Sequence, residues 1–175
     1  TEIRRIQQEV GITAIYVTHD QSEAMAISDN IIIMNKGVVA QMGTPQEIYH
    51  HPADEFVADI IGEANFLRSK CKSTDGAYAV LDFEGKDLKV PAKAGMEKGK
   101  EYTAVLRPEA AKLADEGGLE AKVVLSCFMG SYQNYHVKVG ETLVKLEDHN
   151  PKNRKVYNVG ETCHLVVDTD SLHVL

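Results

Sequence analysis

The segment Tyr16-Val17-Thr18-His19-Asp20-Gln21-Ser22-Glu23-Ala24 is where residue types and order most clearly suggest chemistry. The apolar and β-branched run 12–18 predicts a strand buried on both faces, and His19 follows it, just before a short helix expected over 20–26. In open α/β sheets, ligands bind at this end of the strands. The imidazole either contacts a ligand or stabilises the helix start, and the residues alone leave both roles open.

The sequence contains no phosphate-binding loop of the form G-x-x-x-x-G-K-[ST]. Gly85-Lys86 is followed by Asp87, and Gly99-Lys100 is followed by Glu101. We therefore expect the chain to have almost no means of holding a triphosphate and to bind no cofactor by itself.

The cysteines and histidines predict neither a disulfide framework nor a metal site. Cys71, Cys127 and Cys163 are odd in number and widely spaced, which favours reduced thiols. His50-His51 and the remaining histidines lack the spacing of metal ligands on a helix. No metal is expected.

Arg107-Pro108-Glu109 is a second candidate site. A guanidinium can bind carboxylates and small oxyanions through two hydrogen bonds, so Arg107 and Glu109 are candidate regulatory or interface residues. The alternative is a turn at the end of a strand, carrying an exposed ion pair of little energetic value.

Composition and charge indicate a globular protein without a nucleic-acid partner. The chain is 43% hydrophobic and 26% charged, with a net charge of -7. Residues 1–63 carry three Lys/Arg and ten Asp/Glu, and residues 64–175 carry sixteen of each. Phe128, Tyr132 and Tyr135 could stack on bases, but such sites lie in basic grooves. No apolar run approaches the ~20 residues of a membrane span and no signal peptide is evident, so we expect a soluble, cytoplasmic polypeptide.

Residues 1–63 predict an α/β unit. A helical pattern is already running at residue 1, without an initiator methionine, and ends at Gly11, which indicates part of a longer protein. Strands are expected over 30–34 and 38–42 as a hairpin, the first of them buried, and Thr44 should cap a helix over 45–50. Another helix is expected over 54–61, with an apolar side formed by Phe56, Val57, Ile60 and Ile61. The strands would leave open edges and a bare sheet face, so something should cover them.

Residues 64–175 predict a separate all-β domain, with the boundary near residue 63. Short β-rich runs separated by Gly, Asp and Asn are typical of a small barrel or sandwich. The expected strands are 66–71, 78–83, 88–90, 102–106, 119–128, 135–139, 143–146 and 163–167.

A family resemblance rests mainly on the string YVTHDQSEA. Further matching strings follow it in order: Ser28-Asp29-Asn30-Ile31, Asn35-Lys36-Gly37, Gln41-Met42-Gly43-Thr44-Pro45, Glu47-Ile48-Tyr49, Pro52 and Phe56-Val57-Ala58. Residues 1–66 thereby resemble the end of the nucleotide-binding domain of ABC importers. Ile61-Gly62-Glu63-Ala64-Asn65 and Leu106-Arg107-Pro108-Glu109 resemble parts of the β-barrel (TOBE) domain that follows it.

The resemblance implies a fold: an α/β fragment of a P-loop ATPase domain over 1–63, followed by an all-β OB-like TOBE domain over 64–175 with a regulatory and dimerisation role. It gives His19 the γ-phosphate contact of the switch loop. The full-length protein would use ATP and Mg²⁺, form a homodimer, and work with membrane permease subunits and a solute-binding protein at the inner face of the membrane. The junction Gly62-Glu63-Ala64-Asn65 favours spermidine/putrescine or ferric iron as the solute.

Two other functions remain open from the residues. A stand-alone small-ligand sensor built on the β-domain would leave YVTHDQSEA unexplained. A nucleic-acid-binding OB protein is disfavoured by the acidic charge balance.

Overall fold

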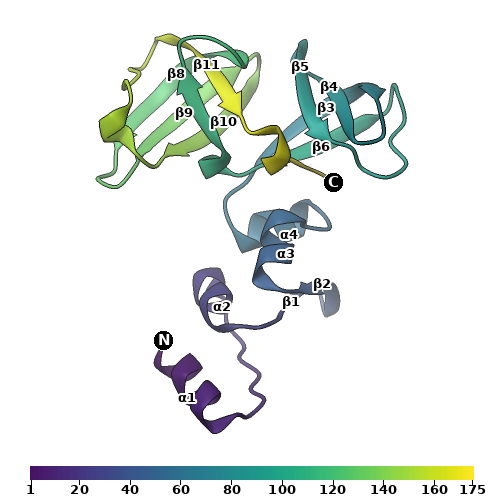
Figure 1. Ribbon diagram of the computed structural model, residues 1–175, viewed down its shortest axis with the longest axis vertical. Coiled ribbons are helices and arrows are strands. Elements are labelled where there is room, and N and C mark those ends of the chain that lie inside the picture. The colour runs from purple at the N-terminus through teal and green to yellow at the C-terminus, as the bar shows by residue number, and fades with distance from the viewer. The chain divides into compact units, whose positions relative to one another are not determined.

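The computed structural model describes residues 1–152 and 154–175, and the chain divides into two compact units, Thr1–Glu63 and Ala64–Leu175 (Figure 1). The helices and strands of the first unit are α1 (Glu2–Val10), α2 (Gln21–Ile27), β1 (Ile31–Asn35), β2 (Val38–Gly43), α3 (Pro45–His50) and α4 (Glu55–Ile61).

Helix starts in the first unit are set by capping side chains. Asp20 and Asp54 accept hydrogen bonds from backbone N–H groups in the first turns of α2 and α4. Thr44 and Glu47 form a complete capping box at α3, where Pro45 occupies the first turn. The helices expected at these places are confirmed, and α1 ends as expected at Gly11, in the left-handed region at φ 71°.

The strand expected over 12–18 is wrong. This segment is extended but unpaired, and Ile15 and Val17 are 92% and 88% exposed. The described part of the first unit holds one sheet, β1 with β2, and neither strand pairs with residues 12–18. A buried parallel strand needs neighbours on both sides, so the apolar sequence alone cannot make one.

Strands β1 and β2 form the expected antiparallel hairpin, with positive φ at both Lys36 and Gly37, as a tight two-residue turn requires. The prediction that the first strand of the hairpin is buried was wrong for one of its faces. Ile31 and Ile33 are buried, whereas Ile32 and Met34 are each 57% exposed. One face of the hairpin joins a small core with the helices that follow, and its buried members are Ile31, Ile33, Ile48, Val57 and Ile61. The apolar side predicted for α4 is correct for Val57 and Ile61 but not for Ile60, which is 45% exposed.

The second unit is all-β, as predicted, and contains two antiparallel five-stranded sheets. The first has the order β12-β6-β3-β4-β5 and the second the order β10-β9-β8-β11-β7. The strand bounds are β3 Asn65–Thr74, β4 Tyr78–Phe83, β5 Lys86–Pro91, β6 Glu101–Leu106, β7 Ala111–Ala114, β8 Leu119–Phe128, β9 Gln133–Val139, β10 Thr142–Asp148, β11 Thr162–Val167 and β12 His173–Val174. Three short 3₁₀ turns are η1 Pro108–Ala110, η2 Pro151–Asn153 and η3 Thr169–Ser171.

The second sheet curls until its two edge strands, β10 and β7, come into contact with each other. A five-stranded antiparallel sheet that nearly closes on itself is the form of an OB-like half-barrel. The eight predicted strands are present, whereas β7 and β12 were missed because they are only 4 and 2 residues long.

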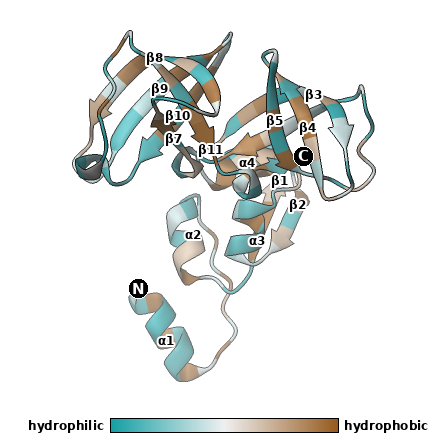
Figure 2. Ribbon diagram, turned by 45° about the horizontal axis from the view of Figure 1, so that its top comes forward, coloured by the Kyte–Doolittle hydropathy of each residue, from teal (hydrophilic) through white to brown (hydrophobic). Residues whose placement is uncertain are grey.

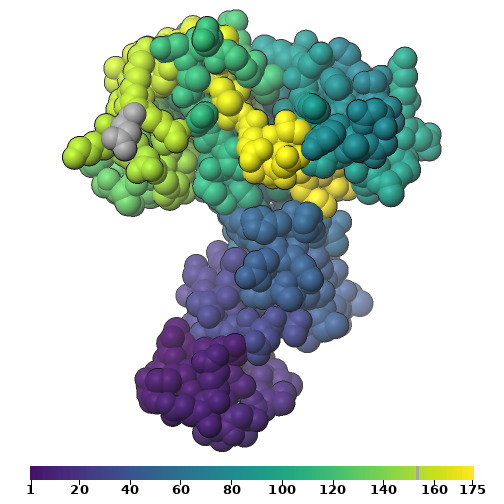
Figure 3. All heavy atoms as spheres, in the orientation of Figure 1, coloured from purple at the N-terminus to yellow at the C-terminus, as the bar shows by residue number. Residues whose placement is uncertain are grey.

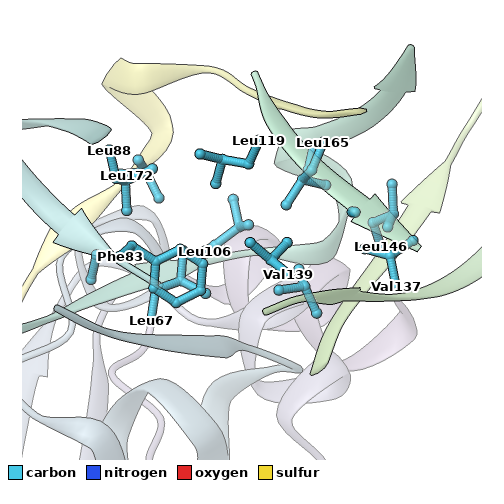
Figure 4. Close-up of a cluster of buried hydrophobic side chains, with 14 of the residues drawn as sticks. Leu67, Phe83, Leu88, Leu106, Leu119, Val137, Val139, Leu146, Leu165 and Leu172 are labelled. Carbon is cyan, nitrogen blue, oxygen red and sulfur yellow. The ribbon is translucent and has the colours of Figure 1, made fainter. Parts of the chain in front are cut away.

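Both sheets of the second unit contribute to one hydrophobic core. Leu67, Phe83 and Leu106 enter it from the first sheet, and Val137 and Leu165 from the second (Figure 4). In β9 alternate residues are buried and the intervening ones are more exposed, as expected for a strand with one face on the core. Figure 3 shows the C-terminal residues, drawn in yellow, packed between the green and teal parts of the same unit, and Figure 2 shows the brown apolar bands of its strands. The C-terminal residues thus help to join the two sheets.

Candidate functional site

His19 lies in a short turn between the extended segment and α2. The Thr18 hydroxyl accepts a hydrogen bond from the Asp20 N–H at 3.0 Å, and Asp20 Oδ1 accepts one from the Glu23 N–H at 3.0 Å. The His19 side chain is exposed between these two anchored residues. The turn therefore has a defined backbone shape and leaves the imidazole available to a ligand.

A second contact closes the segment around His19. The Tyr16 hydroxyl is hydrogen-bonded to the Glu23 carboxylate, and this bond raises the pKa of Tyr16. The contact joins the extended segment to the first turn of α2, so that the backbone on both sides of the histidine is held.

Helix α1 is joined to the residues after α2 by a bidentate ion pair. Arg4 Nη2 lies 2.8 Å from Asp29 Oδ1, and Arg4 Nη1 donates to Asp29 Oδ2 at 3.1 Å. The Asp29 side chain is 71% exposed, so solvent screens this pair and it positions α1 only weakly. No residue of α1 is buried.

The residues around His19 do not by themselves fit a nucleotide. Gly85-Lys86 belongs to the tight turn that joins β4 to β5, and Gly99-Lys100 precedes β6, so neither connects a strand to a helix as a phosphate-binding loop does. In the part of the chain that the structure describes, no three His, Cys, Asp or Glu side chains gather as a metal site would require. Side chains that bind a nucleotide or magnesium would have to come from outside the described residues.

Arg107 and Glu109 differ sharply in environment, although only Pro108 separates them. Arg107 follows β6 and is 5% exposed, whereas Glu109 in η1 is exposed. The turn predicted at the end of the strand is therefore present. The predicted exposed ion pair is not, because the Arg107 side chain is buried. A regulatory or interface role for these two residues stays a prediction.

Glu109 also lines a cleft of about 740 Å³ within the second unit. Asp148, which is 7% exposed, lines the same cleft, and its Oδ1 is 3.5 Å from Arg154 Nη1. The remaining polar residues of the lining are Lys112, Glu147, His149 and Asp168. Sequence reasoning proposed only Glu109 as a site residue here, because most of the other polar lining residues lie at 147–154 and 168, far from it in the sequence.

Comparison with known proteins bears on what these units are. Residues 104–175 match the family model described as TOBE domain. The chain is 42% identical over 154 residues to the Fe(3+) ions import ATP-binding protein FbpC of Rhizobium etli, a match covering 85% of this chain and 42% of the relative. It is 39% identical over 166 residues to the spermidine/putrescine import ATP-binding protein PotA of Ruegeria pomeroyi, covering 91% of this chain and 44% of the relative.

The chain is a relative of ABC importer ATP-binding subunits. A third match, to PotA of Borreliella afzelii, is 35% identical over 179 residues and covers 99% of this chain. The chain spans a little under half the length of this importer subunit, 48%, and similar fractions of the other two.

Among solved structures, the cytoplasmic molybdate-binding protein ModG matches with a TM-score of 0.49 at 15% identity, covering 63% of this chain and 94% of ModG. Within the described residues of this importer-subunit relative, no helix is both long and apolar enough to cross a membrane.

Proposed function

We propose that this chain is part of the ATP-hydrolysing subunit of an ABC importer that takes up spermidine/putrescine or ferric iron. The observation that carries the proposal is that importer ATP-binding subunits named for Fe(3+) and for spermidine/putrescine align with 85% and 91% of the chain. Residues 1–63 belong to the end of the nucleotide-binding domain, and residues 64–175 form its TOBE domain.

His19 is the residue that contacts the γ-phosphate of ATP in the full-length protein. Its exposure and its anchored flanks support this role, because an imidazole N–H on a fixed backbone can donate to a phosphate oxygen without reorganising. ATP and Mg²⁺ would be held mainly by groups that this chain does not contain. The chain alone is inactive as an ATPase.

The apolar surface of residues 1–43 is covered by the remainder of the nucleotide-binding domain. Ile15, Val17 and Met42 are among its exposed side chains, and both an unpaired segment and a two-stranded sheet with open edges are suited to joining a larger sheet.

The second unit regulates the ATPase and helps two subunits to associate. We assign the regulatory role to Glu109, which is exposed, and to Arg107, which is buried two residues before it. The homodimer works with membrane permease subunits and a solute-binding protein. The full-length protein lies in the cytoplasm, peripheral to the inner face of the membrane. A stand-alone sensor is not favoured, because it leaves the Tyr16–Ala24 segment without a role.

The experiment is a His19→Ala substitution in the full-length protein. We expect ATP turnover and uptake of labelled spermidine or ferric iron to be lost while nucleotide affinity stays near normal. His50→Ala, which removes another exposed histidine of the same unit, is the control and should leave turnover intact. Normal transport by the His19 variant would remove this residue from the mechanism.

A further inference from the structure

Two lysines face each other on the outer side of the curled sheet. Lys122 of β8 is the direct cross-strand partner of Lys138 of β9, and both side chains are exposed. Within the described residues neither ammonium group has an ion-pair partner. Like charges placed directly opposite each other destabilise a sheet. Folding stability therefore does not account for this pair.

The same face continues onto β10 with further positive charge and an exposed apolar group. Leu143 lies opposite Lys138 and is 42% exposed, and Lys145 lies opposite His136. The inward-pointing neighbours Val123, Val137 and Val144 are fully packed in the core. The lysines consequently cannot turn inward and remain on the surface of β8, β9 and β10, three adjacent strands (Figure 1).

The positive face is local and does not follow from the overall charge of the protein, which is -7. It is also bounded by carboxylates, since Glu120 precedes Lys122 by two residues and Glu147 follows Lys145 by two, on the same sides of their strands. A bilayer of anionic lipid or a nucleic-acid backbone carries continuous negative charge and would meet both carboxylates. A polypeptide with separated carboxylates and apolar side chains would not.

We propose that the outer face of β8, β9 and β10, centred on Lys122 and Lys138, binds an acidic polypeptide segment of a partner protein. Carboxylates of the segment lie between the two ammonium groups and relieve their repulsion, and an apolar side chain of the segment packs on Leu143. The proposal does not depend on the import function proposed above, because it uses neither the first unit nor Arg107 and Glu109.

The test measures binding of a fluorescent synthetic peptide of alternating Glu and Leu to the full 175-residue chain. We expect saturable binding at low salt that weakens as salt is added. Lys122→Glu combined with Lys138→Glu should weaken binding at least tenfold. The matched control, Lys93→Glu with Lys98→Glu, makes the same change of charge at two exposed loop residues and should leave affinity within about twofold.

Several results would overturn the proposal. These are no peptide binding at low salt, an equal loss in the control variant, or tighter binding of phosphatidylglycerol vesicles or a single-stranded oligonucleotide than of the peptide. A second measurement does not depend on the charge-reversed variants folding. Lys138→Thr should raise the Tm of the free chain at low salt, and that gain should shrink at high salt. An unchanged or lower Tm would contradict the proposal, because it would show that the repulsion between Lys122 and Lys138 does not destabilise the free chain.

Discussion

The side chain of Asn65 forms two hydrogen bonds with the backbone of Lys145, although the two residues belong to different sheets. Asn65 Nδ2 donates to the Lys145 carbonyl at 2.7 Å, and the Lys145 N–H donates to Asn65 Oδ1 at 2.8 Å. The same Nδ2 donates to the Leu106 carbonyl at 3.1 Å. The carboxamide thus imitates a peptide group along the edge of β10 and joins the two sheets.

Asn65→Ala should destabilise the chain by about 3 kcal/mol, because it removes these bonds and leaves polar groups of Lys145 unpaired in a partly buried place. Urea unfolding monitored by circular dichroism measures the loss. Asn134→Ala on the outer face of β9 is the control and should cost under about 0.5 kcal/mol. Equal losses for the two variants would contradict a special role for the Asn65 carboxamide.

Glu84 provides a second link between the sheets and should make stability depend on pH. Its carboxylate accepts hydrogen bonds from the Thr142 hydroxyl at 2.7 Å and the Glu141 N–H at 3.2 Å, and these bonds lower the pKa of Glu84. A lowered pKa in the folded state means that the stabilisation is complete above the unfolded value near 4.5 and is lost as the pH falls below it. Glu84→Gln should therefore lower Tm at pH 7 and have little effect at pH 3. An equal effect at both pH values would contradict this link.

Gly140 permits this contact with Glu84. A Cβ atom at residue 140 would lie 2.3 Å from Glu84 Oε2, and its φ of 57° is in the left-handed region. Gly140→Ala should displace the Glu84 carboxylate and destabilise the chain by about 1 kcal/mol or more. In the Glu84→Gln background the additional cost should be smaller, and thermal unfolding of the double variant measures the difference.

The hydroxyl of Tyr157 should ionise at a higher pH than those of the other tyrosines. Its hydroxyl donates to Asp115 Oδ1 at 2.6 Å, and burial together with this bond raises its pKa above the ordinary value of 10.0. Because the raised pKa stabilises the neutral form, this contribution is present below pH 10 and is lost as the pH rises further. Tyr157→Phe should remove the late phase of an ultraviolet titration and cost about 1 kcal/mol at neutral pH. A titration curve unchanged by the substitution would refute the assignment.

The exposed segment 12–18 should drive self-association of the isolated chain. Ile15 and Val17 have no cover within the first unit, and unpaired extended backbone next to them can pair with another copy. Light scattering should show mass rising with concentration, and Ile15→Lys with Val17→Lys should suppress it. A monomer at high concentration in the unmodified chain would contradict the prediction.

Local signals in the sequence proved the most informative about structure. The Thr44 and Glu47 capping box requires only neighbouring residues, and the bounds predicted for α3 are those observed. The short β-rich runs between turn residues likewise predicted eight of the strands of the second unit. The strand predicted over residues 12–18 is absent, because a strand there needs pairing partners that the described chain does not offer.

The candidate sites divide in the same way. The turn at His19 was found from a contiguous string, and its anchors Thr18 and Asp20 lie inside that string. The cleft at Asp148 and Arg154 arises only when the sheet curls and β10 meets β7, a relationship that no spacing in the sequence records. The Lys122 and Lys138 pair depends on strand register in the same manner.

The lack of strand partners for residues 12–18 gives the segment a use as an internal reporter. Within the described chain its backbone N–H groups join no ladder, so their hydrogens should exchange with deuterated solvent at nearly the rate of an unstructured peptide. When the rest of a nucleotide-binding domain or a second copy pairs with the segment, the same hydrogens should become slow to exchange. Mass spectrometry of this peptide would then follow assembly directly, without any label near His19.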